Sequence, residues 1–340
     1  MKIAINGFGR IGRCVYRVLA EREDIRIVAV NDISPDEPLT YLLRFDSVMG
    51  RFPGPVTLEN GVLSAGVHTP RLVKERDPAS LPWAELGVDV VVEATGRFRS
   101  RAELEGHLQA GAGRVVLTVP PKDEIDAMVV LGVNDDILLP EHRIVSNASC
   151  TTNCLAPLAK ILDDSFGLER GVMTTTHAYT NDQRLSDWYH QDLRRSRAAG
   201  ENTIPTSTGA ARAVGKVLPK LAGKLDGMAM RVPVPDGSVV DLVATLKKKV
   251  TKEQVNDALA KAAKTKGMKG VLAYTDDPIV SQDIVGDPHS SIIDGGATMV
   301  IADKTVKVVS WYDNEWGYSN RVVQLMRFAH RLKAPKRAKR

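Results

Sequence analysis

The sequence predicts an α/β protein with two domains, in which a doubly wound parallel sheet is followed by an α+β domain with a mainly antiparallel sheet. Short apolar strands alternate with helical stretches over residues 1–149, and a glycine-rich turn joins the first strand to the first helix. After residue 150, longer strands cluster apart from the helices. A length of 340 residues is also enough for two domains.

The N-terminal segment contains a glycine fingerprint between a strand and a helix. An apolar strand at 2–6 leads into a G-x-G-x-x-G motif formed by Gly7, Gly9 and Gly12. In this motif the glycines allow a tight turn, a close approach of backbone to a pyrophosphate, and packing of helix on strand. Asp32 lies 20 residues beyond Gly12, where a carboxylate can bind an adenosine ribose and repel a 2′-phosphate. We therefore predict a Rossmann-type domain that binds NAD.

The other elements of the first domain follow from alternating strand and helix periods. We expect strands at 25–30, 88–93, 114–119, 128–132 and 144–146, and helices at 12–22 and 101–110. The strand at 88–93 runs into the turn Thr95-Gly96. This turn should face the cofactor, because ligands bind at the carboxyl edge of such sheets.

The second domain is expected over residues 150–315. It should contain helices at about 150–165, with a kink at Pro157, and near 209–218 and 252–265, with strands at 171–177, 226–232, 239–247, 298–302 and 305–312. The arginine-rich segment 181–202 is expected to be a functional or assembly loop. A final amphipathic helix at about 316–332 should pack back on the first domain, formed by 1–149.

A cysteine at the predicted start of a helix is the candidate nucleophile. Cys150 is flanked by small hydroxyl residues, and the amides and dipole of a helix N-terminus favour a thiolate. His177 lies 27 residues further on, where it can complete an ion pair and later move protons. Most free cysteines are small buried hydrophobes. The glycine fingerprint in the same chain favours the catalytic interpretation.

A thiolate beside a nicotinamide ring suits the oxidation of an aldehyde through a thiohemiacetal and a thioester. Release of the thioester needs a second nucleophile, and the sequence offers anion-binding residues for one. Thr208 and Gly209 precede a helix, where hydroxyls and amides bind phosphate, although ordinary capping is the alternative. Arg231 lies within an apolar strand and needs an anionic partner, which could also be a structural carboxylate.

Composition excludes several other classes of function. The net charge of +5 is located in the tail 333–340, which carries five basic residues and is expected to be disordered, so we do not expect nucleic-acid binding. No apolar run is long enough to span a membrane, and the first strand leaves no room for a signal peptide. The three cysteines form no metal or disulfide pattern, which favours a cytoplasmic protein without a bound metal.

Five segments, 4–13, 146–154, 176–183, 208–215 and 311–320, resemble the phosphorylating glyceraldehyde-3-phosphate dehydrogenase family, and the resemblance covers all but the tail. It implies that Cys150 is the acyl-forming nucleophile and His177 its base and proton donor. It implies a substrate-phosphate site of Thr180 and Arg231, and an inorganic-phosphate site of Ser149, Thr151, Thr208 and Gly209.

The resemblance also implies a cofactor site and an assembly. The NAD groove would be lined by Arg10, Ile11, Asp32, Arg76, Thr95, Gly96 and Thr118. Asn314 would orient the nicotinamide amide, with Tyr318 beside it. Glyceraldehyde 3-phosphate and inorganic phosphate would be the substrates. The family forms homotetramers in which the loop after His177 crosses toward a neighbouring subunit.

Some residues depart from the family pattern. Trp188-Tyr189 replaces the usual Leu-Pro of NAD-specific members, so use of NADP stays open although Asp32 favours NAD. Tyr189-His190 is similar to erythrose-4-phosphate dehydrogenase, in which water releases the acyl group, whereas Thr208-Gly209 favours the phosphorylating family. A third alternative is a scaffold or RNA-binding protein that uses the nucleotide groove.

Overall fold

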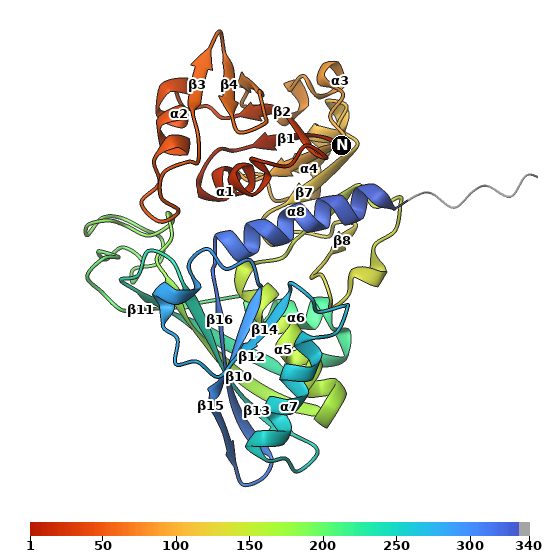
Figure 1. Ribbon diagram of the computed structural model, residues 1–340, viewed down its shortest axis with the longest axis vertical. Helices are drawn as coiled ribbons and strands as arrows, with labels where there is room; N and C mark the ends of the chain where they lie inside the picture. Colours follow the sequence, from red (N-terminus) through yellow and green to blue (C-terminus); the bar gives the residue numbers. More distant parts are fainter. Residues whose placement is uncertain (333–340) are drawn as a thin grey trace, which may run out of the picture. The chain divides into compact units, whose positions relative to one another are not determined.

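The computed structural model describes residues 1–332, and the basic tail predicted at 333–340 lies outside them. The chain divides into two compact units. The first contains Met1–Val129, Asp135–Ala148 and the chain from Ser319 onward, and the second contains Val130–Asn134 and Ser149–Tyr318. Figure 1 shows each unit built around its own sheet.

The first unit has a nine-stranded sheet with the order β3-β4-β5-β2-β1-β6-β7-β9-β8. Its strands are β1 Lys2–Asn6, β2 Arg26–Asn31, β3 Val56–Glu59, β4 Val62–Ala65, β5 Arg71–Val73, β6 Val90–Glu93, β7 Arg114–Leu117, β8 Ala127–Met128 and β9 Ile144–Ser146. The run β5-β2-β1-β6-β7-β9 is parallel throughout, which confirms the doubly wound prediction. Strand order reverses between β1 and β6, so a ligand crevice belongs at their carboxyl ends.

The helices of the first unit are α1 Arg10–Leu19, α2 Asp36–Arg44, α3 Trp83–Leu86, α4 Arg101–Gln109 and α8 Trp316–Arg331, of which the first turn of α8 belongs to the second unit. Short 3-10 turns lie at η1 Pro78–Ser80 and η2 Asp135–Ile137. Strands β6 and β7 are buried along their whole length, as expected for parallel strands covered on both faces. Within this unit α8 is anchored by hydrogen bonding and charge: Arg114 donates to the Ala329 carbonyl, and Arg327 pairs with Asp24 at 2.9 Å.

One strand of the first domain was predicted wrongly. The apolar segment 128–132 was expected to be a strand, but β8 ends at Met128 and Val130–Asn134 belongs to the second unit. There, Val130 N donates to Asn134 Oδ1 at 2.8 Å, so this segment turns on itself instead of pairing with a strand. An apolar run alone does not distinguish these two outcomes.

The second unit has a seven-stranded sheet with the order β11-β12-β10-β13-β16-β15-β14. Its elements are α5 Cys150–Phe166, β10 Leu168–Ala178, β11 Ile204–Ser207, α6 Ala210–Val217, η3 Pro219–Leu221, β12 Leu225–Val232, β13 Ser238–Leu246, α7 Lys252–Ala263, β14 Leu272–Thr275, η4 Ser281–Ile284, β15 Ser291–Ile301 and β16 Thr305–Tyr312. Four of the six neighbouring strand pairs are antiparallel, which confirms the prediction of a mainly antiparallel sheet.

Three features of the second unit refine the sequence prediction. Helix α5 continues through Pro157 to Phe166. The strand expected at 298–302 is the end of a longer strand, β15. Helices α5, α6 and α7 pack on the sheet, while side chains such as Val172 and Val243, which face each other across β10 and β13, stay exposed.

Candidate active site

The candidate nucleophile begins a helix, as the sequence predicted. Cys150 is the first residue of α5, and the Ser149 hydroxyl caps the helix by accepting a hydrogen bond from Thr152 N at 3.0 Å. Ala148 has a φ of +54°, in the left-handed region that alanine seldom adopts. This turn places the thiol among the first amides of α5, where a thiolate is favoured.

A buried histidine lies beside the thiol. His177 is near the end of β10, and its Nε2 is 3.6 Å from Cys150 Sγ. The strand register places His177 directly opposite Arg231 of the parallel neighbour β12. The parallel pairing of β10 and β12 therefore brings an imidazole and a guanidinium side by side next to the thiol.

The contacts of the imidazole define the two roles that Nδ1 can take. His177 Nδ1 lies 2.7 Å from the Ala178 carbonyl oxygen, and a carbonyl oxygen can only accept. Arg231 Nη1 donates to that same oxygen at 2.9 Å and lies 2.8 Å from Nδ1, and a guanidinium can only donate. A hydrogen on Nδ1 is donated to Ala178 and leaves the lone pair of Nε2 directed at Cys150, whereas a bare Nδ1 accepts from Arg231 and places the hydrogen on Nε2.

Burial sets the protonation of this pair. Burial lowers the pKa of His177 to about 3, and the guanidinium of Arg231 acts in the same direction. Burial also raises the pKa of the Cys150 thiol, against the opposing effects of Arg231 and of hydrogen bonds from Thr151. The ion pair anticipated from the sequence stays a prediction, because burial disfavours the charged form of both groups whereas Arg231 and the hydrogen bonds from Thr151 favour the thiolate.

Arg231 is a cation without a carboxylate partner. Its Nη1 donates to Ala178, its Nε is buried without a hydrogen-bond partner, and it forms no ion pair within residues 1–332. Burial lowers the pKa of this guanidinium, although the nearby Asp182 raises it. Because a partly buried guanidinium with an unbonded Nε needs a further acceptor, the site favours an anionic ligand over the structural salt bridge considered above.

The loop between β10 and β11 adds two charged residues that sequence reasoning missed. Thr180 donates its hydroxyl to Asp182, and Arg195 pairs with the same carboxylate. Arg195 also donates from Nε to the Thr206 hydroxyl at 2.9 Å. The arginine-rich composition of 181–202 was the available signal, but it does not indicate which arginine turns inward.

The other hydroxyls predicted for phosphate binding have partners within the protein. Thr151 Oγ1 is 2.8 Å from the hydroxyl of Tyr312, which is also 2.9 Å from Thr175 Oγ1. Thr208 accepts a hydrogen bond from Ala210 N at 3.2 Å, at the start of α6. Gly209 is the N-cap of α6 and offers no side-chain cap, so its exposed backbone is accessible. Thr208 thus has the capping role named as its alternative.

The first unit contains a cavity of about 290 Å³ at the reversal of strand order. It is lined by Asn6, Gly7, Gly9, Asn31, Asp32, Ile33, Glu75, Arg76, Ala94, Thr95, Arg97 and Phe98. Five of the residues predicted for the cofactor are in this lining: Gly7, Gly9, Asp32, Arg76 and Thr95. The others are not: Arg10, Ile11, Gly12, Gly96, Thr118, Asn314 and Tyr318.

The three glycines fit a dinucleotide. Gly7 has a φ of +92°, and a Cβ there would lie 2.6 Å from Thr95 N. A Cβ on Gly12 would lie 2.1 Å from the Gly7 carbonyl oxygen, so the helix and strand could not pack as closely. No atom lies within 4 Å of a Cβ built on Gly9, which leaves its backbone open to a ligand. Asp32 braces the turn, because it accepts a hydrogen bond from Phe8 N at 2.8 Å.

The remaining predicted cofactor residues have other contacts. Arg10 forms an ion pair with Asp46. Thr118 donates its hydroxyl to the Glu93 carbonyl at 3.0 Å. Asn314 accepts a hydrogen bond from the Ser238 hydroxyl at 2.6 Å within the second unit. That bond fixes the amide oxygen of Asn314 and turns its amide nitrogen away from Ser238.

Over residues 1–332, no group of His, Cys, Asp or Glu side chains could hold a metal ion. In that same part of the chain, no helix is long and apolar enough to cross a membrane. Cys14 and Cys154 are buried, and Cys154 Sγ is 3.4 Å from Ser310 Oγ, which agrees with a packing role for this second thiol.

The chain combines a doubly wound nucleotide-binding domain with a thiol at the first residue of a helix and a histidine beside that thiol. These features define a dinucleotide-dependent dehydrogenase that works through cysteine. Comparison with known proteins names the family more closely. The profile for the glyceraldehyde 3-phosphate dehydrogenase NAD binding domain matches residues 1–101, and that for the C-terminal domain matches residues 149–314. The chain belongs to the glyceraldehyde 3-phosphate dehydrogenase family.

Similar proteins called glyceraldehyde-3-phosphate dehydrogenase occur in several bacteria. The chain is 57% identical to one from Borreliella burgdorferi over 331 residues, covering 96% of this chain and 98% of that one. It is 57% identical to one from Mycobacterium avium over 333 residues, covering 96% and 97%. It is 53% identical to one from Streptomyces coelicolor over 330 residues, covering 96% and 98%.

Proposed function

We propose that the chain catalyses the NAD-dependent oxidation and phosphorylation of D-glyceraldehyde 3-phosphate to 1,3-bisphosphoglycerate, a reversible step of glycolysis and gluconeogenesis. The observation that carries this proposal is the position of His177 Nε2, 3.6 Å from Cys150 Sγ and beside an arginine that has no carboxylate partner. Membership of the family and the fit of the glycine turn to a dinucleotide support it.

In the first step His177 acts as a general base. Its Nε2 takes the proton of the Cys150 thiol as sulfur adds to the aldehyde carbon, and returns it to the carbonyl oxygen of the thiohemiacetal. Bound NAD supplies the hydride acceptor that converts this adduct into a thioester. The imidazole then accepts the hydroxyl proton, and the hydrogen bond from Nδ1 to the Ala178 carbonyl oxygen keeps the ring in place throughout.

Anionic groups of the substrates have two candidate positions. Arg231 and Thr180 hold the phosphate of the triose, since the Arg231 guanidinium is the unpaired cation nearest the thiol. Ser149, Thr151, Thr208 and Gly209 surround the inorganic phosphate that attacks the thioester. Asp182 and Arg195, which share an ion pair, complete this surface.

In the proposed cofactor site the first amides of α1 face the pyrophosphate, because Gly9 gives this helix no side-chain cap. Asp32 and Arg76 line the adenosine side. Asn314, with Tyr318, holds the nicotinamide amide. Asp32 favours NAD over NADP by repulsion of a 2′-phosphate, and Trp188 and Tyr189 are exposed enough to modulate that preference.

The proposal extends to organisation and location. Residues 1–149, with the helix at about 316–332, act as the NAD-binding domain and 150–315 as the catalytic domain. Val172 and Val243, which are exposed neighbours on β10 and β13, with exposed Met299 beyond Lys307 of β16, support assembly into a homotetramer. Three free cysteines support a reducing cytoplasm.

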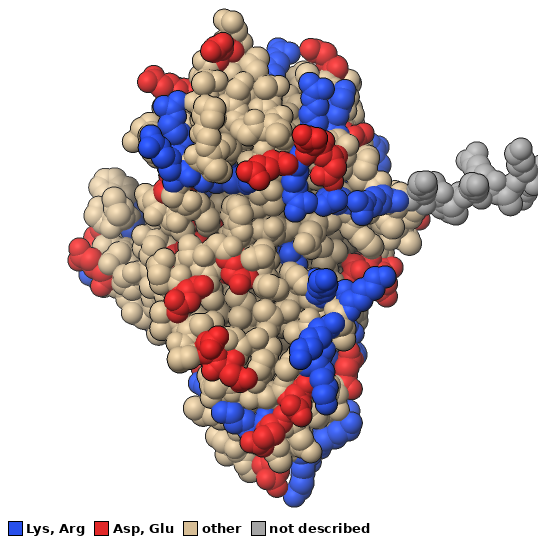
Figure 2. All heavy atoms as spheres, in the orientation of Figure 1, with Lys and Arg blue, Asp and Glu red and all other residues tan. Residues whose placement is uncertain are grey.

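The alternatives gain no support. Figure 2 shows Lys and Arg interspersed with Asp and Glu over the face that it presents, in keeping with a neutral body that lacks the basic stripe of an RNA-binding protein. Erythrose-4-phosphate dehydrogenase activity requires release of the thioester by water, and the accessible Gly209 backbone at the start of α6 favours phosphate.

The test is an initial-rate assay of NADH formation with glyceraldehyde 3-phosphate, with and without inorganic phosphate. Parallel assays use erythrose 4-phosphate and NADP. We expect turnover that depends on phosphate and is fastest with the triose and NAD. Faster turnover of the four-carbon sugar without phosphate would assign the chain to the sister enzyme instead.

A further inference from the structure

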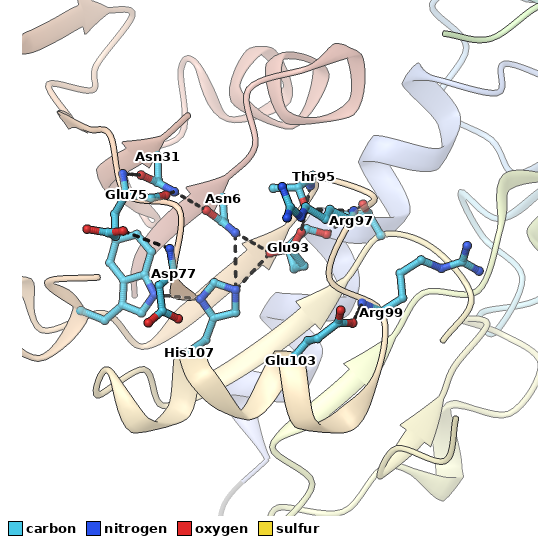
Figure 3. A network of polar contacts seen from close by, with 12 residues as sticks. Asn6, Asn31, Glu75, Asp77, Glu93, Thr95, Arg97, Arg99, Glu103 and His107 are labelled. Atoms are coloured by element: carbon cyan, nitrogen blue, oxygen red, sulfur yellow. Dashed lines mark hydrogen bonds and ion pairs between the residues drawn. The ribbon is translucent and has the colours of Figure 1, made fainter. Parts of the chain in front are cut away.

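A buried carboxylate behind the cofactor cavity collects four hydrogen bonds (Figure 3). Glu93, at the end of β6, is fully buried. Its Oε2 lies 2.5 Å from Asn6 Nδ2 and 3.0 Å from His107 Nε2, and its Oε1 accepts from the amide and the hydroxyl of Thr95. A carboxyl group that accepts from four donors has no position left for a hydrogen of its own, so Glu93 is ionised.

This charge has no cation beside it. Trp83 Nε1 donates to His107 Nδ1 at 3.0 Å, and an indole nitrogen can only donate. His107 therefore holds its single hydrogen on Nε2 and gives it to Glu93, which makes the imidazole neutral. Within residues 1–332, no Lys or Arg forms an ion pair with Glu93. The negative charge is stabilised by oriented dipoles alone.

The two asparagine amides are held from both ends of the network. The Glu75 backbone fixes Asn31, because Glu75 N donates to Asn31 Oδ1 at 2.8 Å and the Glu75 carbonyl accepts from Asn31 Nδ2 at 2.9 Å. Asn31 Nδ2 also donates to Asn6 Oδ1 at 2.7 Å, so the Asn6 amide turns its nitrogen toward Glu93, which accepts from it. A single direction of donation thus runs from the Glu75 segment through β2 and β1 to Glu93.

The members of this chain divide into a lining and a backing. Asn6, Asn31, Glu75 and Thr95 line the cavity at the ends of three parallel strands and the loop after β5. Glu93 and His107 are absent from the lining, although they hold those residues in place. Two residues of the lining, Asn6 and Thr95, are therefore held by a charge that is itself outside the lining.

We propose that Glu93 is a positioning residue for the dinucleotide, whose charge holds the Asn6 amide and Thr95 in place. The inference rests on the proposed NAD site and goes beyond it, because it assigns cofactor affinity to a residue outside the lining. Replacing a carboxylate oxygen by an NH₂ group turns a donor toward other donors, so either Asn6 and His107 or Thr95 would lose the acceptor that holds it.

The first experiment measures NAD affinity of Glu93→Gln by quenching of intrinsic fluorescence, together with kcat at saturating NAD. We expect Kd to rise about 10- to 100-fold, the effect of losing one or two charge-assisted hydrogen bonds. The value of kcat should stay within about twofold, because the Cys150–His177 pair is untouched. An unchanged Kd would overturn the inference.

A double-mutant cycle tests transmission along the network. No hydrogen bond joins Glu93 to Asn31 directly; Asn6 lies between them. Asn31→Ala should weaken NAD binding in the wild type but have a smaller effect in the Glu93→Gln background, since Asn6, which joins the two residues, is no longer held there. Additive effects within about 0.5 kcal/mol would show two independent contacts and overturn the proposed transmission.

Variants of two buried histidines distinguish an effect on NAD binding from an effect on the stability of the fold. His107→Gln disturbs the backing of the network, whereas His68→Gln removes a histidine of the same unit that bonds the Leu19 carbonyl at 2.7 Å and is absent from the cavity lining. Both should lower Tm, but only His107→Gln should raise Kd for NAD, by about threefold or more. These variants carry the test if Glu93→Gln does not fold.

Two results would overturn the inference. Equal Kd values for the two histidine variants would show that the network serves stability alone. Failure of the wild type to bind NAD would overturn the proposed function as well, whereas normal NAD binding by both the wild type and Glu93→Gln would leave the proposed function intact and reject only the positioning role.

Discussion

Two buried histidines, one in each unit, show how the same side chain acquires opposite chemistry. His177 Nδ1 faces both a carbonyl oxygen and the guanidinium of Arg231, and its Nε2 lies 3.6 Å from a thiol and is the atom that can act on it. His107 holds its hydrogen on Nε2, because an indole N–H occupies Nδ1, and both ring nitrogens are engaged. The partner of one nitrogen thus decides whether the other can accept a proton.

The largest effect on turnover should come from removing the Cys150 thiol, on which His177 acts. Cys150→Ser should reduce turnover by about 10⁴-fold or more, because a serine hydroxyl is a far weaker nucleophile beside a single neutral base. Steady-state rates measure this, with NAD affinity as the control, which should be unchanged. Substantial activity in the variant would contradict the assignment of Cys150 as the nucleophile.

Paired substitutions of the two histidines test the comparison directly. His177→Gln should lower kcat about 10²- to 10⁴-fold, the usual contribution of a general base, and slow alkylation of Cys150 by iodoacetamide. His107→Gln should leave the alkylation rate unchanged, since neither of its nitrogens is free to act on a thiol. If both variants slowed alkylation equally, the tautomer argument would be wrong.

Arg231 should show opposite effects on activity and on stability. Arg231→Met should raise KM for the phosphorylated aldehyde by about 100-fold, through loss of a charge-assisted pair. The free energy of unfolding should stay equal or increase, because a buried and incompletely bonded cation is replaced by an apolar chain. Urea denaturation alongside kinetics measures both. A large loss of stability would indicate a structural role instead.

The smallest expected effect concerns acid stability. The pKa of His177 is about 3 in the folded protein against 6.5 for an ordinary histidine, so the unfolded chain binds more protons between these values. The stability that neutral His177 contributes is therefore present above pH 6.5 and lost as the pH falls toward 3. Urea unfolding from pH 7 to pH 4 should show a shallower decline in His177→Asn than in the wild type. Parallel curves would argue against a depressed pKa.

Motifs with a fixed spacing were predictable, whereas relations between distant segments were not. The glycine turn and the Cys150 helix start can be recognised because each feature is local. Nothing in the sequence indicates that Trp83 meets His107, or that Ala178 orients the ring of His177, since both depend on the packing of distant or bent segments. Glu93 was predicted only as part of a buried strand, because a carboxylate that collects four donors cannot be inferred from its neighbours in sequence.

Some elements were missed although their signals were present. Strands β3 and β4 form a hairpin around Asn60-Gly61, a pair typical of tight turns with positive φ, and both residues have it. Helix α2, which was not predicted, contains Pro38 within its first turn, where proline is tolerated. The inward turn of Arg195 depends on Asp182 and Thr206, which lie at the two ends of an irregular loop.

The order in which the units are completed has a consequence for synthesis of the chain. Strand β9 and helix α8 both belong to the first unit, but almost all of the second unit is translated between them. At about 5–20 residues per second, the ribosome needs roughly 10–30 s to cover this interval. Throughout that time the first unit lacks the buried side chains of α8, among them Val322, Leu325 and Met326, and the contacts of this helix with Arg114 and Asp24. The unit that begins first is thus finished last.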